Sequence, residues 1–151
     1  MVVMQSKLLR TADGQRTFVV VLDTGDEAFR DVTDFARRES IDAASLTAIG
    51  AFERAVLGFY DLDRREYDRL RVDEQVEVVS LVGDLSLGTD GAPMLHAHVV
   101  VARRDGSTLG GHLLEGRVRP TLEIVVSETD AHLRRRYDER SGLPLIALDE
   151  S

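Results

Sequence analysis

Residues 93–112 read PMLHAHVVVARRDGSTLGGH and predict a β-hairpin. An apolar, β-branched segment leads into the turn pair Asp105-Gly106, and a second segment of strand character follows it. His96 and His98 are two residues apart. Because side chains alternate between the two faces of a strand, both imidazoles project from the same face. This spacing suits two ligands of one metal ion.

Whether His112 joins them depends on the turn. A two-residue turn at Asp105-Gly106 places His98 opposite Leu113, which leaves His112 on the other face. A three-residue loop over residues 104–106, with its glycine in the left-handed conformation, instead pairs His98 with His112. The Cβ atoms of such a pair lie about 5 Å apart. The three-residue loop therefore brings all three imidazoles together.

A β-bulge at Gly110-Gly111, combined with the shorter turn, is a second device that gives the same result. Three imidazoles with a fourth position open to water or substrate form the zinc arrangement found in catalytic sites, and other borderline divalent ions also fit it. The chain has no cysteine, so a thiolate site is excluded. We therefore predict a divalent metal site at His96, His98 and His112, with zinc as the favoured ion. The alternative is a set of hydrogen-bonded histidines at a subunit interface.

One amphipathic helix is predicted over about residues 26–38. Thr24 and Glu27 form a capping-box pattern, with Thr24 as the N-cap and Glu27 at the third helical position. Phe29 and Phe35 belong to an apolar set at helical spacing, and charged residues occupy the opposite face.

The remaining pattern is mostly that of β-strands. Strand-like segments occur at residues 17–22, 45–50, 55–60, 67–72, 76–87, 94–102, 107–114, 121–127 and 143–148. The polar residues 134–140 predict coil or a short helix. Many successive strands with one helix predict an α+β fold with a mainly antiparallel sheet, strongly curled toward a barrel.

Length and composition indicate one globular domain over residues 1–151. Hydrophobic residues make up 43% of the chain and charged residues 30%. No segment approaches the roughly 18 apolar residues of a membrane-spanning helix. Residues 1–10 lack the long apolar segment of a secretion signal. These features predict a cytoplasmic protein that does not enter the membrane.

The formal net charge of −8 disfavours direct binding to DNA, because an acidic surface repels phosphate groups on average. The densest basic cluster is formed by residues 134–136 and Arg140. A solvated face or ion pairs between subunits are favoured over phosphate binding there.

Glu123 is the candidate catalytic residue. It lies in an apolar strand whose other residues, Leu122 and Ile124, face the opposite way. A carboxylate on that face is suited to support a metal ligand or to act as a general base, and the alternative is a place at a subunit seam or on the surface. Asp84, beside Gly83, is assigned to a turn or bulge in preference to a site.

A set of short motifs resembles the bacterial and archaeal form of the plant and prokaryote conserved (PPC) domain. The motifs are residues 95–98 (LHAH), Asp105-Gly106, 110–113 (GGHL), Val118, 121–123 (TLE) and, upstream, 50–52 (GAF), 58–60 (GFY) and 77–83 (EVVSLVG). The likeness covers about residues 5–130 and leaves residues 131–151 as a C-terminal extension.

This resemblance implies a single-domain α+β fold, a homotrimer, and a metal held by His96, His98 and His112 near a subunit interface. Members of the family carry a DNA-binding label, but in the plant members a separate AT-hook contacts the DNA, and the domain itself serves oligomerisation and partner binding. This chain lacks the Arg-Gly-Arg-Pro hook, since Val118 stands where the hook has glycine. The first interpretation is therefore a DNA-associated, partner-binding regulatory module.

The second interpretation is a metal-dependent enzyme of the lyase or hydrolase type. The histidine pattern is distantly similar to that of acetolactate decarboxylase, a zinc lyase. In this interpretation the ion polarises a carbonyl group or activates water, and Glu123 assists.

Overall fold

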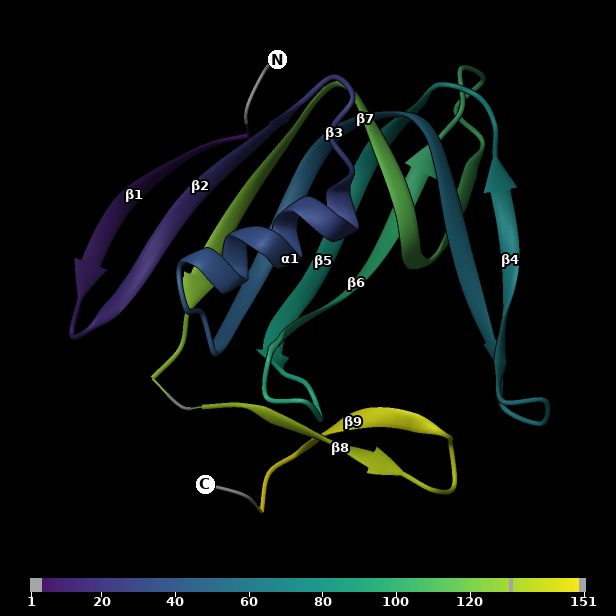
Figure 1. Cartoon of the computed structure of the whole chain (residues 1–151). Helices are drawn as coiled ribbons and strands as arrows, with labels where there is room; N and C mark the ends of the chain where they lie inside the picture. The colour runs from purple at the N-terminus through teal and green to yellow at the C-terminus, as the bar shows by residue number, and fades with distance from the viewer. Residues whose placement is uncertain (1–3, 131, 150–151) are drawn as a thin grey trace.

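The computed structural model describes residues 4–130 and 132–149. Within these residues nine strands surround one helix (Figure 1). The helix is α1 (Ala28–Arg38), and the strands are β1 (Gln5–Ala12), β2 (Gln15–Asp23), β3 (Ala43–Asp61), β4 (Glu66–Val72), β5 (Val76–Leu87), β6 (Pro93–Ala102), β7 (Thr108–Glu128), β8 (Arg134–Asp138) and β9 (Leu143–Ala147).

All nine strands belong to one sheet with the order β1-β2-β7-β3-β5-β8-β9, while β4 pairs with β3, and β6 pairs with both β5 and β7. Strands β3, β5, β6 and β7 therefore form a closed circuit of pairing, which curls the sheet back on itself. Among the described pairs, only β5 with β8 is parallel. The chain is predominantly β with an antiparallel-dominated mixed sheet, so the predicted α+β class fits only loosely.

The helix is confirmed, but it begins two residues later than predicted, and its N-cap is Glu27 instead of Thr24. The Glu27 carboxylate accepts hydrogen bonds from the backbone N–H groups of Phe29 and Arg30. The preceding residues form a turn whose backbone pairs with β7, because Gly25 donates to the Val118 carbonyl and Val118 donates to that of Asp26. Pairing with a strand far along the sequence thus overrides the local capping pattern.

Two pairs of predicted strands are each one long strand. Residues 45–50 and 55–60 are continuous in β3, and residues 107–114 and 121–127 are continuous in β7. The register between β3 and β7 shifts at three places, and such bulges let a long strand bend without ending. The residues predicted as coil or short helix, 134–140, form β8 and the turn into β9 instead.

The core lies between α1 and the face of the sheet that α1 covers (Figure 1). Phe18 of β2 and Phe35 of α1 meet edge to face, with their ring centroids 5.2 Å apart. In β6 the alternating residues Leu95, Ala97 and Val99 are buried in this core. The intervening residues of β6, which include both of its histidines, therefore face away from the helix.

Candidate metal centre

The β6–β7 hairpin adopts the three-residue loop. His98 pairs directly with His112, and Ala102 pairs with Thr108. The backbone N–H of Arg103 donates to the Ser107 carbonyl at 2.8 Å, and Gly106 has the left-handed φ of +83°. Pairing is one to one from His98 to Ala102, so the alternative bulge at glycines 110 and 111 is not used.

The structure brings His96, His98 and His112 together. Each offers one ring nitrogen, and these three atoms all lie within 4.8 Å of one another. The Nε2 atoms of His96 and His98 are 3.3 Å apart. Two nitrogens bound to a tetrahedral zinc ion at about 2.0–2.1 Å would be separated by about 3.3 Å. The separation of these two imidazole nitrogens therefore fits the metal that their chemistry predicts.

The electrostatic environment keeps two of the imidazoles neutral, as metal ligation requires. Burial, assisted by the charges of His96 and His98, lowers the pKa of His112 to about 4. Burial and the Arg135 guanidinium lower the pKa of His96, and this outweighs the opposite effect of Asp84. Near neutral pH both rings therefore have a free lone pair.

Tyr67 of β4 covers one side of the cluster. Its ring stacks on that of His112 with a centroid separation of 4.7 Å and an interplanar angle of 29°. Gly58, which pairs with His112, makes room for this contact, because a Cβ atom at residue 58 would lie 2.8 Å from the Tyr67 ring. The contact between Tyr67 and His112 depends on the pairing of β4 with β3. The sequence periodicity of β4 therefore could not predict this contact.

Asp84 and Arg135 lie on the other side of the cluster. Asp84 pairs with His96 across β5 and β6, and its Oδ2 atom is 3.9 Å from the Nδ1 atom of His96. Arg135 donates to Asp84 Oδ1 at 2.7 Å. The assignment of Asp84 to a turn or bulge is therefore wrong, because Asp84 lies in regular pairing within β5. A clue was available in the sequence, because a carboxylate in an otherwise apolar strand is costly to bury unless it has a partner.

Glu123 is not brought to the histidines. As predicted, it faces away from the buried Leu122 and Ile124. It lines a groove of about 430 Å³ on the outer face of the sheet. Across the sheet, the row of pairs from His98 runs through Val82 and Thr47 and reaches β7 two residues beyond Glu123. Three strand spacings, roughly 14 Å along the sheet, therefore separate His98 from this part of β7.

That outer face carries apolar side chains that α1 does not cover. Each of these side chains is between 40% and 60% exposed. The residues are Ile49, Val79, Val82, Val100 and Val125. Val82 pairs with His98, so the apolar face adjoins the histidine cluster directly.

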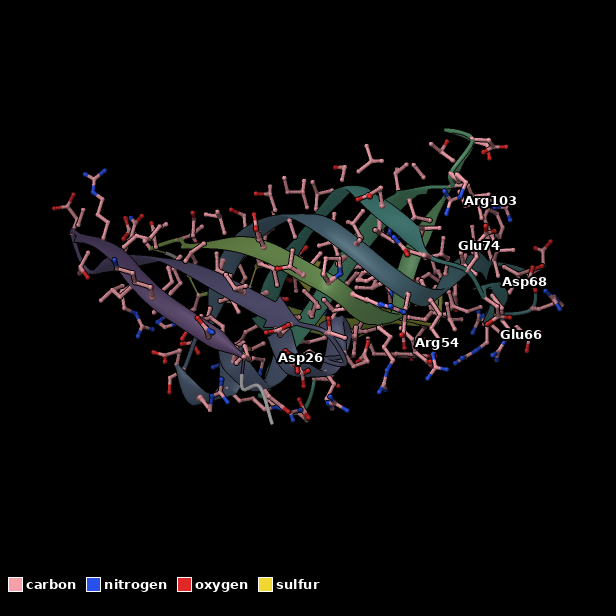
Figure 2. All side chains as sticks on the ribbon, turned by 90° about the horizontal axis from the view of Figure 1, so that it is seen from above. Asp26, Arg54, Glu66, Asp68, Glu74 and Arg103 are labelled. Carbon is pink, nitrogen blue, oxygen red and sulfur yellow. The ribbon has the colours of Figure 1, made fainter. Side chains whose placement is uncertain are left out.

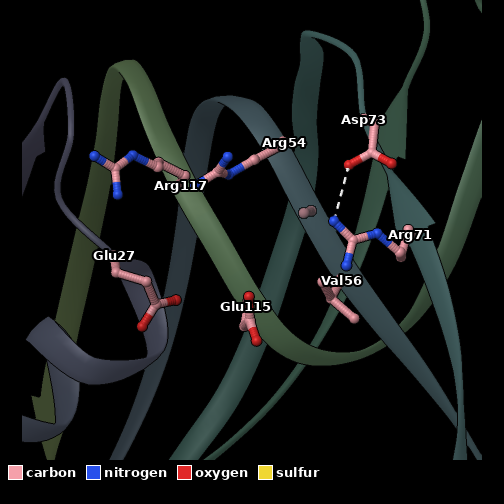
Figure 3. A pocket seen from close by; sticks show the side chains of 8 residues that line it. Glu27, Arg54, Val56, Arg71, Asp73, Glu115 and Arg117 are labelled. Atoms are coloured by element: carbon pink, nitrogen blue, oxygen red, sulfur yellow. Dashed lines mark ion pairs between the residues drawn. The ribbon is translucent and has the colours of Figure 1, made fainter.

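A second pocket, of about 250 Å³, lies between β3, β4 and β7 (Figure 3). It is lined by three arginines and three carboxylates, and Arg71 pairs with Asp73 at 3.5 Å. Glu27, at its edge, already caps the helix and accepts from the backbone of Gly116. The opposite charges balance one another, and the group of potential metal ligands found among the described residues does not include this pocket.

Two further features lie apart from the histidine cluster. His132 is largely exposed and contacts Asp42 at 2.9 Å, in line with its surface position. Charged residues of both signs gather at the end of the molecule near β4, where Figure 2 labels Arg103 with Glu74, an ion pair of 2.7 Å. None of the helices in the described residues is long and apolar enough to span a membrane.

The sequence matches the family model of the Plants and Prokaryotes Conserved (PCC) domain, which is the PPC domain, over residues 9–130. A curated relative, the bifunctional protein GlmU of Synechococcus sp. (strain JA-3-3Ab), is 30% identical over 130 residues, which are 84% of this chain and 20% of that protein. The chain thus spans about a fifth of the length of the curated relatives that it matches.

Solved structures agree with this match over nearly the whole chain. A metal-containing protein from Archaeoglobus fulgidus is 32% identical, with a TM-score of 0.81 and coverage of 97% of this chain and 99% of that one. A PPC protein from Pyrococcus horikoshii is 30% identical, with a TM-score of 0.82 and 97% coverage of both chains. A "putative DNA-binding protein" from Ralstonia eutropha is 31% identical, with a TM-score of 0.83 and coverage of 94% and 96%.

A more distant likeness concerns the fold alone. A Staphylococcus aureus protein similar to α-acetolactate decarboxylase is 14% identical, with a TM-score of 0.52, and the match covers 82% of this chain and 53% of that one. The family match, the similar structures and the motifs around the three histidines agree. This chain belongs to the PPC domain family.

Proposed function

We propose that this chain is a metal-binding PPC module, that His96, His98 and His112 hold one divalent ion, with zinc favoured, and that the module works as a homotrimer. The observation that carries the metal proposal is the convergence of three ring nitrogens within 4.8 Å. The nitrogen separation between His96 and His98 and the lowered pKa values of His96 and His112 support it. A metal-containing relative from Archaeoglobus fulgidus supports it further.

The competing explanation is a set of hydrogen-bonded histidines at an interface. Three neutral rings packed this closely can share few hydrogen bonds, and the contact between His96 and His98 is the one that joins two of them. An ion would satisfy all three acceptor lone pairs at once. Metal binding therefore accounts for the cluster better than hydrogen bonding does.

The homotrimer is supported by the uncovered apolar face around Val82 and Val125. Contiguous exposed apolar side chains on a soluble domain mark surfaces that contact a partner. The number of copies comes from the family resemblance. Because the apolar face adjoins His98, association of copies would place the metal site near a subunit interface.

For the biological role we propose partner binding in association with DNA, without direct contact between this chain and the duplex. The DNA-binding name belongs to the relative from Ralstonia eutropha. The net charge of −8 and the pairing of basic with acidic side chains argue for an indirect association. Binding of the purified chain to random duplex that is strong at low salt and falls steeply with added salt would replace this proposal with direct contact.

One observation favours the metal-dependent enzyme as a second candidate. His98 is exposed, so an ion at the cluster would have a side open to water or a small ligand. A general base at that ion would have to come from a residue other than Glu123, which lies too far away. A carbonyl or carboxylate compound that binds only to the metal-loaded protein would support the enzyme.

The test of the metal proposal is elemental analysis of the purified protein, together with melting temperatures before and after zinc is added. We expect about one ion per chain in the wild type and none in His98→Ala. His132→Ala, which removes an exposed histidine outside the cluster, is the matched control and should retain the metal. A wild type without stoichiometric metal, whose melting temperature zinc does not raise, would end the proposal.

A further inference from the structure

The C-terminal hairpin formed by β8 and β9 lies beyond residues 9–130, which the family model matches. In Figure 1 it crosses the ends of β5 and β6 below the main sheet, with its turn directed toward the β3–β4 turn. Its attachment to the sheet by strand pairing is slight, since β8 meets β5 at one pair, Leu87 with Arg134. Side chains make further contacts between the hairpin and the rest of the molecule. Two of these side chains connect the hairpin to residues that contact His96 and His112.

The first link is Arg135, whose side chain is only 5% exposed. Its guanidinium donates from Nε to the Ser86 hydroxyl at 2.8 Å, from Nη1 to the Pro144 carbonyl at 3.0 Å and from Nη2 to Asp84 at 2.7 Å. A buried guanidinium that donates to three residues on two strands, β5 and β9, has one allowed position. Arg135 therefore fixes the carboxylate of Asp84 relative to the hairpin.

Asp84 in turn faces His96. The free carboxylate oxygen, Oδ2, is 3.9 Å from Nδ1 of His96, while Nε2 of the same ring points to His98. A histidine that ligates a metal through one nitrogen needs a partner at the other, which fixes the tautomer and the ring orientation. Nη2 of Arg135 lies 3.5 Å from the same Nδ1 atom. The Asp84–Arg135 pair therefore flanks Nδ1 and holds the ring with Nε2 directed toward the other histidines.

The second link is Tyr60, whose hydroxyl donates to the carbonyl of Ser141 in the hairpin turn at 2.6 Å. The turn residue Gly142 has a φ of +76°, and a Cβ atom there would lie 3.0 Å from the Tyr60 hydroxyl. The Tyr60 ring meets Tyr67 edge to face at 5.0 Å, and Tyr67 stacks on His112. The hairpin thus also restrains the ring that orients His112.

We propose that the C-terminal hairpin is a positioning element of the three-histidine site, with Arg135 acting on His96 both directly and through Asp84, and Tyr60 acting on His112 through Tyr67. The inference deepens the proposed metal function, and it rests on that function only for its effect on metal affinity. The orientation of His96 is a property of the metal-free protein as well. Arg135 and Tyr60 are positioning residues, because neither touches the place of the ion.

The first measurement is the tautomer of His96 in the metal-free protein, read from the ¹⁵N shifts of its ring by NMR. We expect one tautomer to predominate in the wild type, because Asp84 and Arg135 hold fixed places beside Nδ1, and a mixture of tautomers in Arg135→Gln and in Asp84→Asn. Arg134→Gln is the matched control, because it removes the same charge from an exposed neighbour in the same strand. Unchanged His96 shifts in a folded Arg135→Gln or Asp84→Asn protein would overturn the proposal, even if the wild type binds no metal.

The second measurement is zinc affinity in competition with a chelator. We expect Arg135→Gln and Asp84→Asn each to weaken zinc binding about 10–100-fold, and the double variant to be no weaker than the worse single one, because both act on one pathway. Tyr60→Phe, which keeps the ring and loses the bond to Ser141, should weaken binding less and should fold if Arg135→Gln does not. Wild-type affinity in Asp84→Asn and Tyr60→Phe, with only their melting temperatures lowered, would make the hairpin a purely structural addition.

Discussion

The two faces of β6 carry side chains of opposite character. On the face toward α1, Leu95, Ala97 and Val99 are each 2% exposed and belong to the continuous core. On the other face, His96 is partly exposed, and His98 and Val100 are exposed, next to further apolar residues of the outer sheet. In β6, the odd-numbered residues thus stabilise the fold by packing in the core. The even-numbered residues provide two of the three histidines of the candidate metal site. Substitutions at neighbouring residues should therefore separate stability from metal binding.

The largest expected effect is that of Leu95→Ala on the core face. Loss of a buried leucine side chain should lower the free energy of unfolding by about 2–5 kcal/mol, measured by denaturant titration. Val100→Ala removes apolar atoms from the opposite face of the same strand, and it should cost far less. Equal losses for the two variants would contradict the division between the faces.

The next effect concerns zinc. At a free concentration about 100 times the Kd, zinc should raise the free energy of unfolding of the wild type by about 2.7 kcal/mol. His98→Ala should abolish this gain, while the metal-free variant stays within about 0.5 kcal/mol of the metal-free wild type, because the side chain is exposed. Calorimetry with and without zinc measures both quantities. A metal-free His98→Ala protein as unstable as Leu95→Ala would show that the histidine is part of the core.

A smaller effect is expected from Val82→Glu on the outer face. A carboxylate in an apolar contact without a partner should weaken association by about 1–3 kcal/mol, which sedimentation equilibrium would detect as a shift toward the monomer. Glu66→Gln, in the exposed edge strand β4, is a control that changes charge away from this face. Association that is unaffected by Val82→Glu would place the subunit contact elsewhere.

The smallest effect is a pH dependence of the metal-free protein. The pKa of His112 is about 4 in the fold, against an ordinary value of 6.5. As pH falls from 6.5 toward 4, the unfolded chain takes up a proton that the folded ring does not. The contribution of His112 to the free energy of unfolding is therefore fully present above about pH 6.5, and it is lost progressively as the pH falls toward 4. Because the ring is partly exposed, the loss should be less than the full shift implies.

His112→Gln should remove that part of the pH dependence, since it deletes the titrating ring. The measurement is the difference in melting temperature between the metal-free wild type and the variant from pH 7 to pH 4, which cancels the contributions of other groups. A difference that stays constant over this range would mean that the pKa of His112 is not lowered.

The register of the β6–β7 hairpin shows how much of the site local sequence patterns can predict. Alternation placed His96 and His98 on one face, and the turn chemistry of Asp105-Gly106 allowed a register that pairs His98 with His112, which the structure adopts. Glu123 was also placed correctly on the face opposite Leu122. Its neighbourhood was not predictable, because alternation gives the face of a residue but not its distance from a residue on another strand.

The predictions of the helix start and of the bounds of the long strands failed for a related reason. Thr24 has a good local capping pattern, but it lies in a turn whose backbone pairs with β7, and the helix begins only after Glu27. Residues 51–54 break the strand pattern of β3, yet pairing on both sides keeps them in one strand. In both places long-range hydrogen bonds decide between conformations that differ little in local free energy.

By itself, the sequence determined which residues alternate into the core, where the helix lies, and which three histidines share a hairpin, because these properties depend on spacing over a few residues. Only the tertiary structure decided what surrounds the histidines. Asp84 and Arg135 are 51 residues apart, and Tyr67 reaches His112 from another strand. Such contacts depend on how the sheet curls and where the C-terminal hairpin docks, and both are set by the packing of the whole chain.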